Sequence, residues 1–290
     1  MILVTGATGT TGSAVVRQLN KVGIRPRIMV RDPQKAQRYL PDALVELVQG
    51  DYADAASVKA ALTGISAAYL VSNEDPQFEV QLDQFIRIAE QVGLNKLVVL
   101  SALADPQSDI SFVRLHGQYE QRICQSALNF SIIYPDWFMQ NFLGHIQAGQ
   151  WVFPGGPGLV SFIDVRDVAA FAAKLLQDPT GYHQSCMRIT GPQAMTFAQA
   201  ADKINTMLAG SQCRPFRFIQ PTADEYRSMM LQRGASASSL EMFIGMTSLS
   251  RNGVNYPPTP VFADVMGYQP CSFEQFIQQH MDYIRHWLKS

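Results

Sequence analysis

Hydrophobic residues occur in short, nearly continuous runs at regular intervals through the first half of the chain. Runs of this kind, rich in valine, isoleucine and leucine, are typical of strands buried on both faces of a parallel sheet. The predicted strands are Ile2–Thr5, Arg27–Val30, Leu44–Gln49, Ala67–Ser72, Lys96–Ser101 and Phe130–Tyr134.

Between these runs, apolar residues recur at helical spacing. The predicted helices are Gly12–Gly23, Pro33–Tyr39, Ala55–Leu62, Pro76–Val92 and Ile110–Ala127. Strands that alternate with helices indicate right-handed crossovers and helices on both faces of the sheet. The predicted fold class is therefore α/β, a Rossmann-type doubly wound parallel sheet.

The pattern changes after Pro135. A segment rich in aromatic residues, glycine and proline runs from 136 to 158, and a strand-and-helix unit follows at Leu159–Asp178. A further strand is predicted at Cys186–Thr190. Capping boxes at Thr196 and Ser272, each with glutamine three residues later, open two more helices. The predicted division is a sheet domain at 1–135, to which 159–190 returns, and a smaller mixed C-terminal lobe at 136–290 that closes the substrate cleft.

A glycine-rich turn, Gly6-Ala7-Thr8-Gly9-Thr10-Thr11-Gly12, separates the first strand from the first helix. Glycines in this setting allow a tight turn, close approach of the backbone to a pyrophosphate, and close packing of helix against strand. The helix N-terminus offers N–H groups and a positive dipole end to phosphates. Because the turn lies in a full βαβ series, we interpret it as a dinucleotide site rather than a turn without a ligand. The expected contacts are Gly6, Thr8, Gly9, Thr10, Thr11 and Gly12.

The end of the second strand indicates which dinucleotide binds. NAD sites commonly place an acidic residue there, whereas here Arg31 stands at the strand tip and Lys35 begins the next helix. A guanidinium can hold a 2′-phosphate through two parallel hydrogen bonds. NADP(H) is therefore preferred over NAD(H). The alternatives are that Arg31 and Lys35 form a solvated basic face, or that Asp32 turns inward to a ribose 2′-OH.

Further cofactor contacts are expected at the ends of other strands. Asp51 and Tyr52 follow the third strand and could border the adenine, although Tyr52 could equally belong to an ordinary turn. Ser101 and Ala102 end the fifth strand and are expected to border the nicotinamide. Ser72 and Tyr134 are also expected to contact the cofactor.

The GxxGxxG spacing resembles that of the short-chain dehydrogenase/reductase superfamily, especially its extended and atypical branches. Typical members use a Tyr-x-x-x-Lys pair as their proton relay, which is absent here, since Tyr119 is followed by Ile123. The same helix carries His116 and Glu120 on one face. Histidine titrates near neutrality, so His116 is a candidate catalytic residue. The alternative is a histidine that only hydrogen-bonds a neighbour.

The stretch from His116 to Asn141 resembles the NmrA-like branch of atypical short-chain dehydrogenases, whose members show an Arg-Pro-Gly-x-Phe-x-Glu-Asn signature. Pro135, Phe138 and Asn141 match it, while Tyr134, Asp136 and Gln140 depart from it. Similar stretches at 161–168 and 214–226 extend the resemblance over nearly the whole chain. Within the branch, the sequence looks closest to NAD(P)H:quinone reductases and triphenylmethane-dye reductases. His116 matches the position of the catalytic lysine of isoflavone reductase-like enzymes.

This resemblance implies an NADPH-dependent oxidoreductase that transfers hydride to a quinone or a similar planar electrophile. A quinone accepts hydride without obligatory acid assistance, so positioning can supply much of the acceleration. Trp137, Phe138 and Phe142, with Trp151 and Phe153 nearby in sequence, form the candidate substrate pocket on which a flat acceptor would stack. The alternative is that most of these rings fill a hydrophobic core.

A second hypothesis also fits the missing Tyr-Lys pair. The chain could be a non-catalytic NADP(H)-binding redox sensor that acts through a regulatory protein partner. An epimerase or dehydratase is disfavoured, because it would need the absent pair.

The composition of the chain limits the classes of partner, metal and location that are expected. The 290 residues carry a formal net charge of −1, which gives no reason to expect nucleic acid or a membrane surface. The four cysteines are widely separated, and the histidines lack metal-ligand spacing, so reduced thiols and no metal are expected. Without a signal peptide or an apolar run of bilayer length, a cytoplasmic location is expected. The sequence leaves open whether the chain forms a homodimer.

Overall fold

The computed structural model describes residues 1–72 and 77–289, and the chain forms two compact units. Unit 1 comprises Met1–Gln107, Arg114–Pro135 and Val165–Arg188. Unit 2 comprises Ser108–Val113, Asp136–Asp164 and Ile189–Ser290. Each unit is therefore assembled from segments that are far apart in the sequence.

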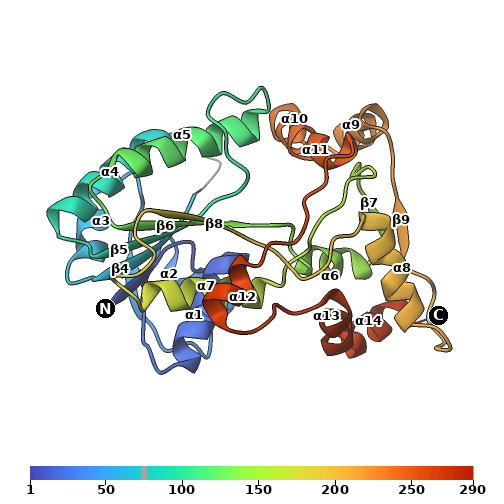
Figure 1. Cartoon of the computed structure of the whole chain (residues 1–290), viewed down its shortest axis with the longest axis horizontal. Coiled ribbons are helices and arrows are strands. Elements are labelled where there is room, and N and C mark those ends of the chain that lie inside the picture. Colours follow the sequence, from blue (N-terminus) through green and yellow to red (C-terminus); the bar gives the residue numbers. More distant parts are fainter. Residues whose placement is uncertain (73–76, 290) are drawn as a thin grey trace. The chain divides into compact units, whose positions relative to one another are not determined.

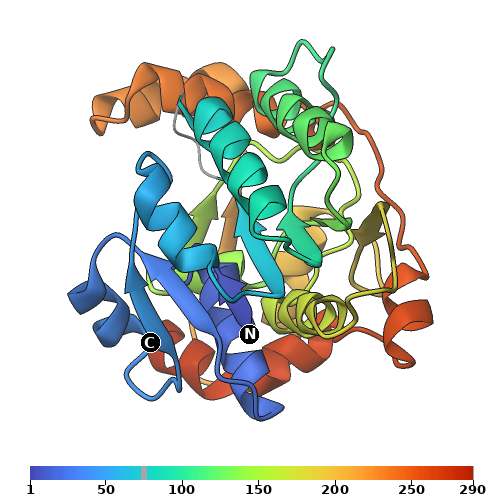
Figure 2. The ribbon, with the colours of Figure 1, turned by 90° about the vertical axis from the view of Figure 1, so that its left-hand side faces the viewer.

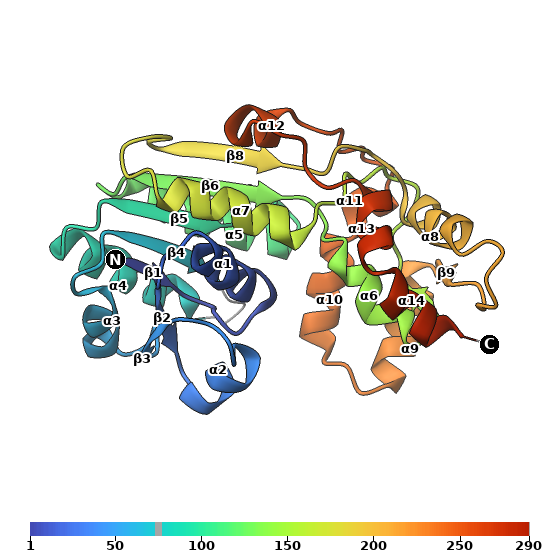
Figure 3. The same ribbon diagram turned by 90° about the horizontal axis from the view of Figure 1, so that it is seen from below.

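Unit 1 is built on a seven-stranded sheet of order β3-β2-β1-β4-β5-β6-β8 (Figure 1). The strands are β1 (Ile2–Val4), β2 (Arg27–Val30), β3 (Glu46–Gln49), β4 (Ala67–Val71), β5 (Lys96–Leu100), β6 (Phe130–Pro135) and β8 (Ser185–Ile189). The pairs from β3 through β6 are parallel, and β8 runs in the direction of β6 in Figure 3. The predicted Rossmann sheet is confirmed, and its strand order reverses at β1, where such sheets bind ligands.

Helices cover both faces of this sheet (Figures 1 and 2). They are α1 (Thr10–Lys21), α2 (Pro33–Tyr39), α3 (Ala55–Leu62), α4 (Phe78–Gln91), α5 (Ser111–Gln125) and α7 (Val165–Leu176). Helices α1 and α7 pack against each other, while α3, α4 and α5 cover the opposite face. Between those three helices and the sheet lies a large apolar core that includes Phe78, Phe85 and Tyr119. All five predicted helices are present; Pro76, where one was expected to begin, lies outside the described residues.

Unit 2 surrounds an aromatic core with short helices and a parallel strand pair, β7 (Gln150–Val152) and β9 (Arg217–Ile219). Its helices are α6 (Gln140–Ile146), α8 (Phe197–Met207), α9 (Ala223–Gln232), α10 (Ala237–Met246), α11 (Ser248–Arg251), α12 (Val261–Met266), α13 (Phe273–Gln279) and α14 (Met281–Leu288). The capping boxes at Thr196 and Ser272 are confirmed, and a third one joins Thr222 to Glu225. The strand expected after Leu159 is reduced to isolated bridges, such as Val160 with Met195.

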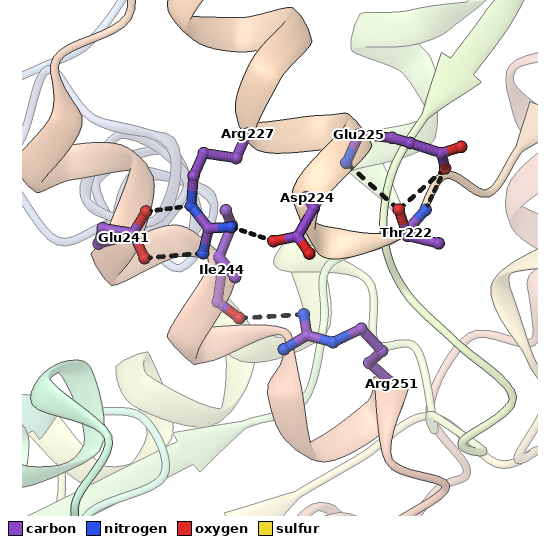
Figure 4. Close-up of polar contacts among 7 residues, drawn as sticks. All are labelled: Thr222, Asp224, Glu225, Arg227, Glu241, Ile244 and Arg251. Carbon is purple, nitrogen blue, oxygen red and sulfur yellow. Dashed lines mark hydrogen bonds and ion pairs between the residues drawn. The ribbon is translucent and has the colours of Figure 1, made fainter.

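Helices α9 and α10 are joined by charge and by ring packing (Figure 4). The Arg227 guanidinium donates to both carboxylate oxygens of Glu241, at 2.5 and 3.1 Å, and also pairs with Asp224. Tyr226 and Phe243 stack with ring centroids 5.7 Å apart. Both kinds of contact hold the two helices as one hairpin.

Candidate functional site

The glycine-rich turn after β1 forms a compact cradle. Gly6 has φ +60°, a conformation that side chains with a Cβ rarely adopt, and its carbonyl accepts a hydrogen bond from Gly9 N at 2.9 Å. A Cβ on Gly12 would lie 2.2 Å from Gly6 O, so only glycine fits at that position. These two glycines hold the start of α1 directly against the end of β1.

The N-terminus of α1 is open to a ligand. Gly9 is its N-cap residue and has no side chain to bond the first-turn N–H groups. Thr5 ties the neighbouring strands together, since its Oγ1 donates to Tyr69 O at 2.9 Å and accepts from Val71 N at 3.2 Å. The helix end therefore faces the carboxyl edge of the sheet at the point where the strand order reverses. This arrangement suits the pyrophosphate of a dinucleotide.

The residues after β2 bear on whether Arg31 meets a 2′-phosphate or Asp32 meets a ribose 2′-OH. The Asp32 carboxylate caps α2 by accepting from Lys35 N at 2.9 Å, so it is engaged locally. Arg31 is exposed, and no hydrogen bond or ion pair within the described residues engages its guanidinium. Lys35 Nζ lies 5.7 Å from the Tyr39 ring centroid. Arg31 and Lys35 are both exposed, and the contact of either with a 2′-phosphate stays a prediction.

Asp51 and Tyr52, which follow β3, are both engaged in local structure. The Asp51 carboxylate accepts from Ala53 N at 2.9 Å, which forms a turn. The Tyr52 ring packs edge-on against Phe78, with centroids 5.5 Å apart, and burial raises the pKa of its hydroxyl. Their contact with an adenine stays a prediction.

A polar network lies where β5 and β6 end and α5 passes over them. Ser101 Oγ donates to Glu120 Oε1 at 2.5 Å, and Tyr134 OH donates to Glu120 Oε2 at 2.6 Å. Ser101 Oγ also lies 3.2 Å from His116 Nδ1. The structure thus brings together three of the predicted site residues, His116, Ser101 and Tyr134, through the carboxylate of Glu120.

Burial sets the charge states in this network. Desolvation lowers the pKa of His116 to about 4, so the imidazole is neutral at pH 7. Desolvation also raises the pKa of Glu120, against the opposing effect of its hydrogen bonds from Ser101 and Tyr134. Burial and the neighbouring Glu120 raise the pKa of Tyr134, which remains a hydrogen-bond donor.

A small cavity of about 10 Å³ lies beside the network, which is room for about one water molecule. The lining residues with polar side chains are Ser72, Ser101, His116, Tyr119 and Glu120. The expected contact of Ser72 and Ala102 with a nicotinamide stays a prediction, although both follow the carboxyl ends of neighbouring strands.

The three aromatic residues of the candidate substrate pocket belong to unit 2. Phe142 is 1% exposed, and its ring lies against those of Trp151, Phe162 and Phe273. Trp137 is half-buried and contacts Phe153 and Phe197, and Phe138 is also half-buried. Their stacking on an acceptor stays a prediction, and Phe142 has the least surface to offer.

Glu120 is a residue of this network to which the sequence pattern assigned no role. Its position four residues after His116 indicated a shared helix face. The link between the two runs through Ser101, which is distant in sequence, so no local spacing could have revealed it.

Fold and cradle together define a dinucleotide-binding Rossmann protein. The sequence profile described as NAD(P)H-binding matches residues 6–179. An NAD(P)H azoreductase of Xenophilus azovorans is 30% identical over 285 residues, which cover 97% of this chain and 98% of the relative. The chain therefore belongs to the NAD(P)H-binding family.

Two solved structures share the fold over nearly their whole length. An NADPH-dependent quinone oxidoreductase of Escherichia coli, complexed with NADPH, superposes with a TM-score of 0.83 at 21% identity, covering 97% of this chain and 100% of that one. A triphenylmethane reductase of a Citrobacter species, complexed with NADP(H), gives a TM-score of 0.81 at 20% identity, with 96% and 99% covered. The resemblance expected from the sequence is confirmed.

None of the helices in the described part of the chain is long and apolar enough to cross a membrane. No group of three or more histidine, cysteine, aspartate or glutamate side chains among the described residues could hold a metal ion.

Proposed function

We propose that the protein is an NADPH-dependent reductase that acts on quinones or similar planar electrophiles, including azo compounds. The observation that carries this proposal is a glycine cradle for a dinucleotide on the same sheet edge as the network of Ser101, Glu120 and His116. In that network the buried His116 is neutral at pH 7, and the chain has no Tyr-x-x-x-Lys pair. The similar proteins support it, since they are named as reductases of azo compounds, quinones and triphenylmethanes.

The residues that would hold the cofactor are distributed along the sheet edge. Gly6, Gly9 and Gly12 let the pyrophosphate approach the first-turn N–H groups of α1. Arg31 would hold the 2′-phosphate, because its guanidinium is exposed and Asp32 is occupied as a helix cap. When bound, the reduced nicotinamide supplies a hydride to the acceptor.

The chain's own contribution to the reaction is positioning and proton control. Without a Tyr-Lys pair, an acceptor whose reduced form is stable as an anion is reduced most readily. His116 would orient the acceptor, and its ring is fixed by Ser101. Acceptor size and shape are proposed to be selected by Trp137 and Phe138.

The first experiment measures NADPH oxidation by the purified protein with a panel of quinones and azo dyes, with NADH run in parallel. We expect turnover with NADPH and little with NADH. Tight NADPH binding without turnover for any acceptor would contradict the reductase and assign the protein to redox sensing.

The NADPH preference is tested with Arg31→Asp, and Arg38→Asp on the following helix α2, also exposed, is the control for general electrostatics. We expect Arg31→Asp to weaken NADPH binding by about 100-fold, because a charge-assisted bidentate contact is replaced by repulsion. NADH binding should change by less than about threefold, since it lacks the 2′-phosphate. Equal losses for both cofactors, or equal effects of the two variants, would contradict the assignment of Arg31.

A further inference from the structure

We propose that Glu120, Ser101 and His116 form a proton relay, which carries a proton from Glu120 to the reduced acceptor. This inference rests on the proposed reductase function and deepens it. It assigns a role to Glu120, and it names the acceptors that need that role: those whose hydride adduct is too basic to leave as an anion.

The hydrogen bonds of the network fix where each proton lies when Glu120 is ionised. Ser101 has one hydroxyl proton, and the 2.5 Å contact gives it to Glu120 Oε1. Ser101 Oγ can then only accept from His116, 3.2 Å away, so Nδ1 of the neutral imidazole carries the proton. In that tautomer His116 Nε2 is a hydrogen-bond acceptor and has no proton to give.

Protonation of Glu120 reverses the direction of the chain. The carboxylic acid donates from Oε1 to Ser101 Oγ, and Ser101 donates to His116 Nδ1. The neutral imidazole then carries its proton on Nε2. A single proton added at Glu120 therefore converts His116 from an acceptor into a donor without any heavy atom moving.

In the relay, each proton moves one position along the hydrogen-bonded chain from Glu120 through Ser101 to His116. Reduction adds a hydride to the acceptor, and the His116 Nε2–H bond breaks as its proton joins the resulting anion. The Ser101 hydroxyl proton moves to His116 Nδ1, and the Glu120 proton moves to Ser101 Oγ. Glu120 is left as a carboxylate, which accepts hydrogen bonds from Ser101 and Tyr134, and it regains a proton from water.

The surroundings of Glu120 allow its carboxyl group to be protonated. The titratable groups facing it are His116 and Cys124 on its own helix, Tyr134 on β6, and Cys186 on β8 beside Tyr134. Within the described residues, no lysine or arginine pairs with Glu120. The nearby Arg122 is committed to Glu79 and Asp83 on α4. Burial therefore favours the neutral acid and raises the pKa of Glu120, against the hydrogen bonds from Ser101 and Tyr134.

The relay can be observed without turnover, by ¹⁵N NMR of His116 in the free protein. Between pH 4 and the pKa of Glu120, we expect the Nε2–H tautomer, and above that pKa the Nδ1–H tautomer. Glu120→Gln should fix one tautomer at all pH values. Tyr134→Phe removes a donor that stabilises the carboxylate, so the tautomer change should move to higher pH. If the tautomer of His116 in the wild-type protein did not change with pH, the relay would be overturned.

Kinetics test whether the proton reaches the acceptor. Glu120→Gln should slow azo reduction by about 100-fold, as expected for loss of a general acid, but slow quinone reduction by less than about threefold. Asp83→Asn is the control, since it removes a carboxylate that faces α5 from the neighbouring helix. Equal slowing of both acceptors by Glu120→Gln would overturn the relay and leave the reductase standing. A wild-type protein that reduces no acceptor would instead refute the proposed function, and the NMR result would still decide the relay.

Discussion

At Gly117, in the middle of α5, the addition of a single methyl group should impair the site while the protein still folds. A Cβ on Gly117 would lie 2.2 Å from Pro106 N and 2.4 Å from Asp105 C. Both are backbone atoms, so they cannot rotate away as a flexible side chain would. To reach ordinary contact, helix and loop must separate by roughly 1–2 Å.

The expected cost divides unequally between stability and activity. Alanine favours the helix by about 1 kcal/mol over glycine, whereas overpacking against backbone costs about 1–3 kcal/mol, so Gly117→Ala should lose about 0–2 kcal/mol of stability and still fold. The same shift carries His116 and Glu120 away from Ser101, whose contacts are 3.2 and 2.5 Å. A misplacement of about 1 Å can lower a rate by about 100-fold.

The matched control is Gly144→Ala in α6, where an added Cβ meets nothing within 4 Å. It should gain up to about 1 kcal/mol in the free energy of unfolding and keep full activity. Urea denaturation and NADPH oxidation with an azo acceptor measure both quantities. If Gly117→Ala were as active as wild type and more stable, the close approach of α5 to the loop would not be what positions the network.

Two further predictions concern stability. Burial lowers the pKa of Lys96 from 10.5 to about 8. The unfolded chain therefore binds a proton that the folded chain has released between these pH values, and stability should rise with pH across this window by up to about 3 kcal/mol. The stability of the Lys96→Met variant, measured by urea denaturation, should lack that rise. A variant with the same pH profile as the wild type would contradict the burial argument. In unit 2, Tyr226→Ala should lower the urea midpoint more than Glu241→Gln, because it removes a buried ring. The small effect of Glu241→Gln should shrink in high salt, since an exposed ion pair is screened. If Glu241→Gln had the larger effect, the ion pair of Arg227 would dominate the α9–α10 hairpin.

The first half of the fold could be predicted from the sequence because its signals are local. Strands buried on both faces must be apolar throughout, and the glycine turn needs residues without a Cβ at fixed positions. The helices Pro33–Tyr39 and Ala55–Leu62 were predicted to the residue, since each begins just after an aspartate that caps it. Unit 2 was less predictable, because short helices around a shared aromatic core leave little periodicity of their own.

The sequence by itself therefore determined the class of fold, the position of the cofactor loop and the presence of a basic residue at the tip of β2. Only the tertiary structure decided how the polar residues are used. Asp32 could have faced a ribose, but it caps α2; Tyr52 could have been a turn residue, but its ring packs into the core. The Ser101–Glu120–His116 chain depends on α5 crossing the ends of β5 and β6. Hydrogen-bond partners of this kind are set by the packing of distant segments, and no local pattern in the sequence records that packing.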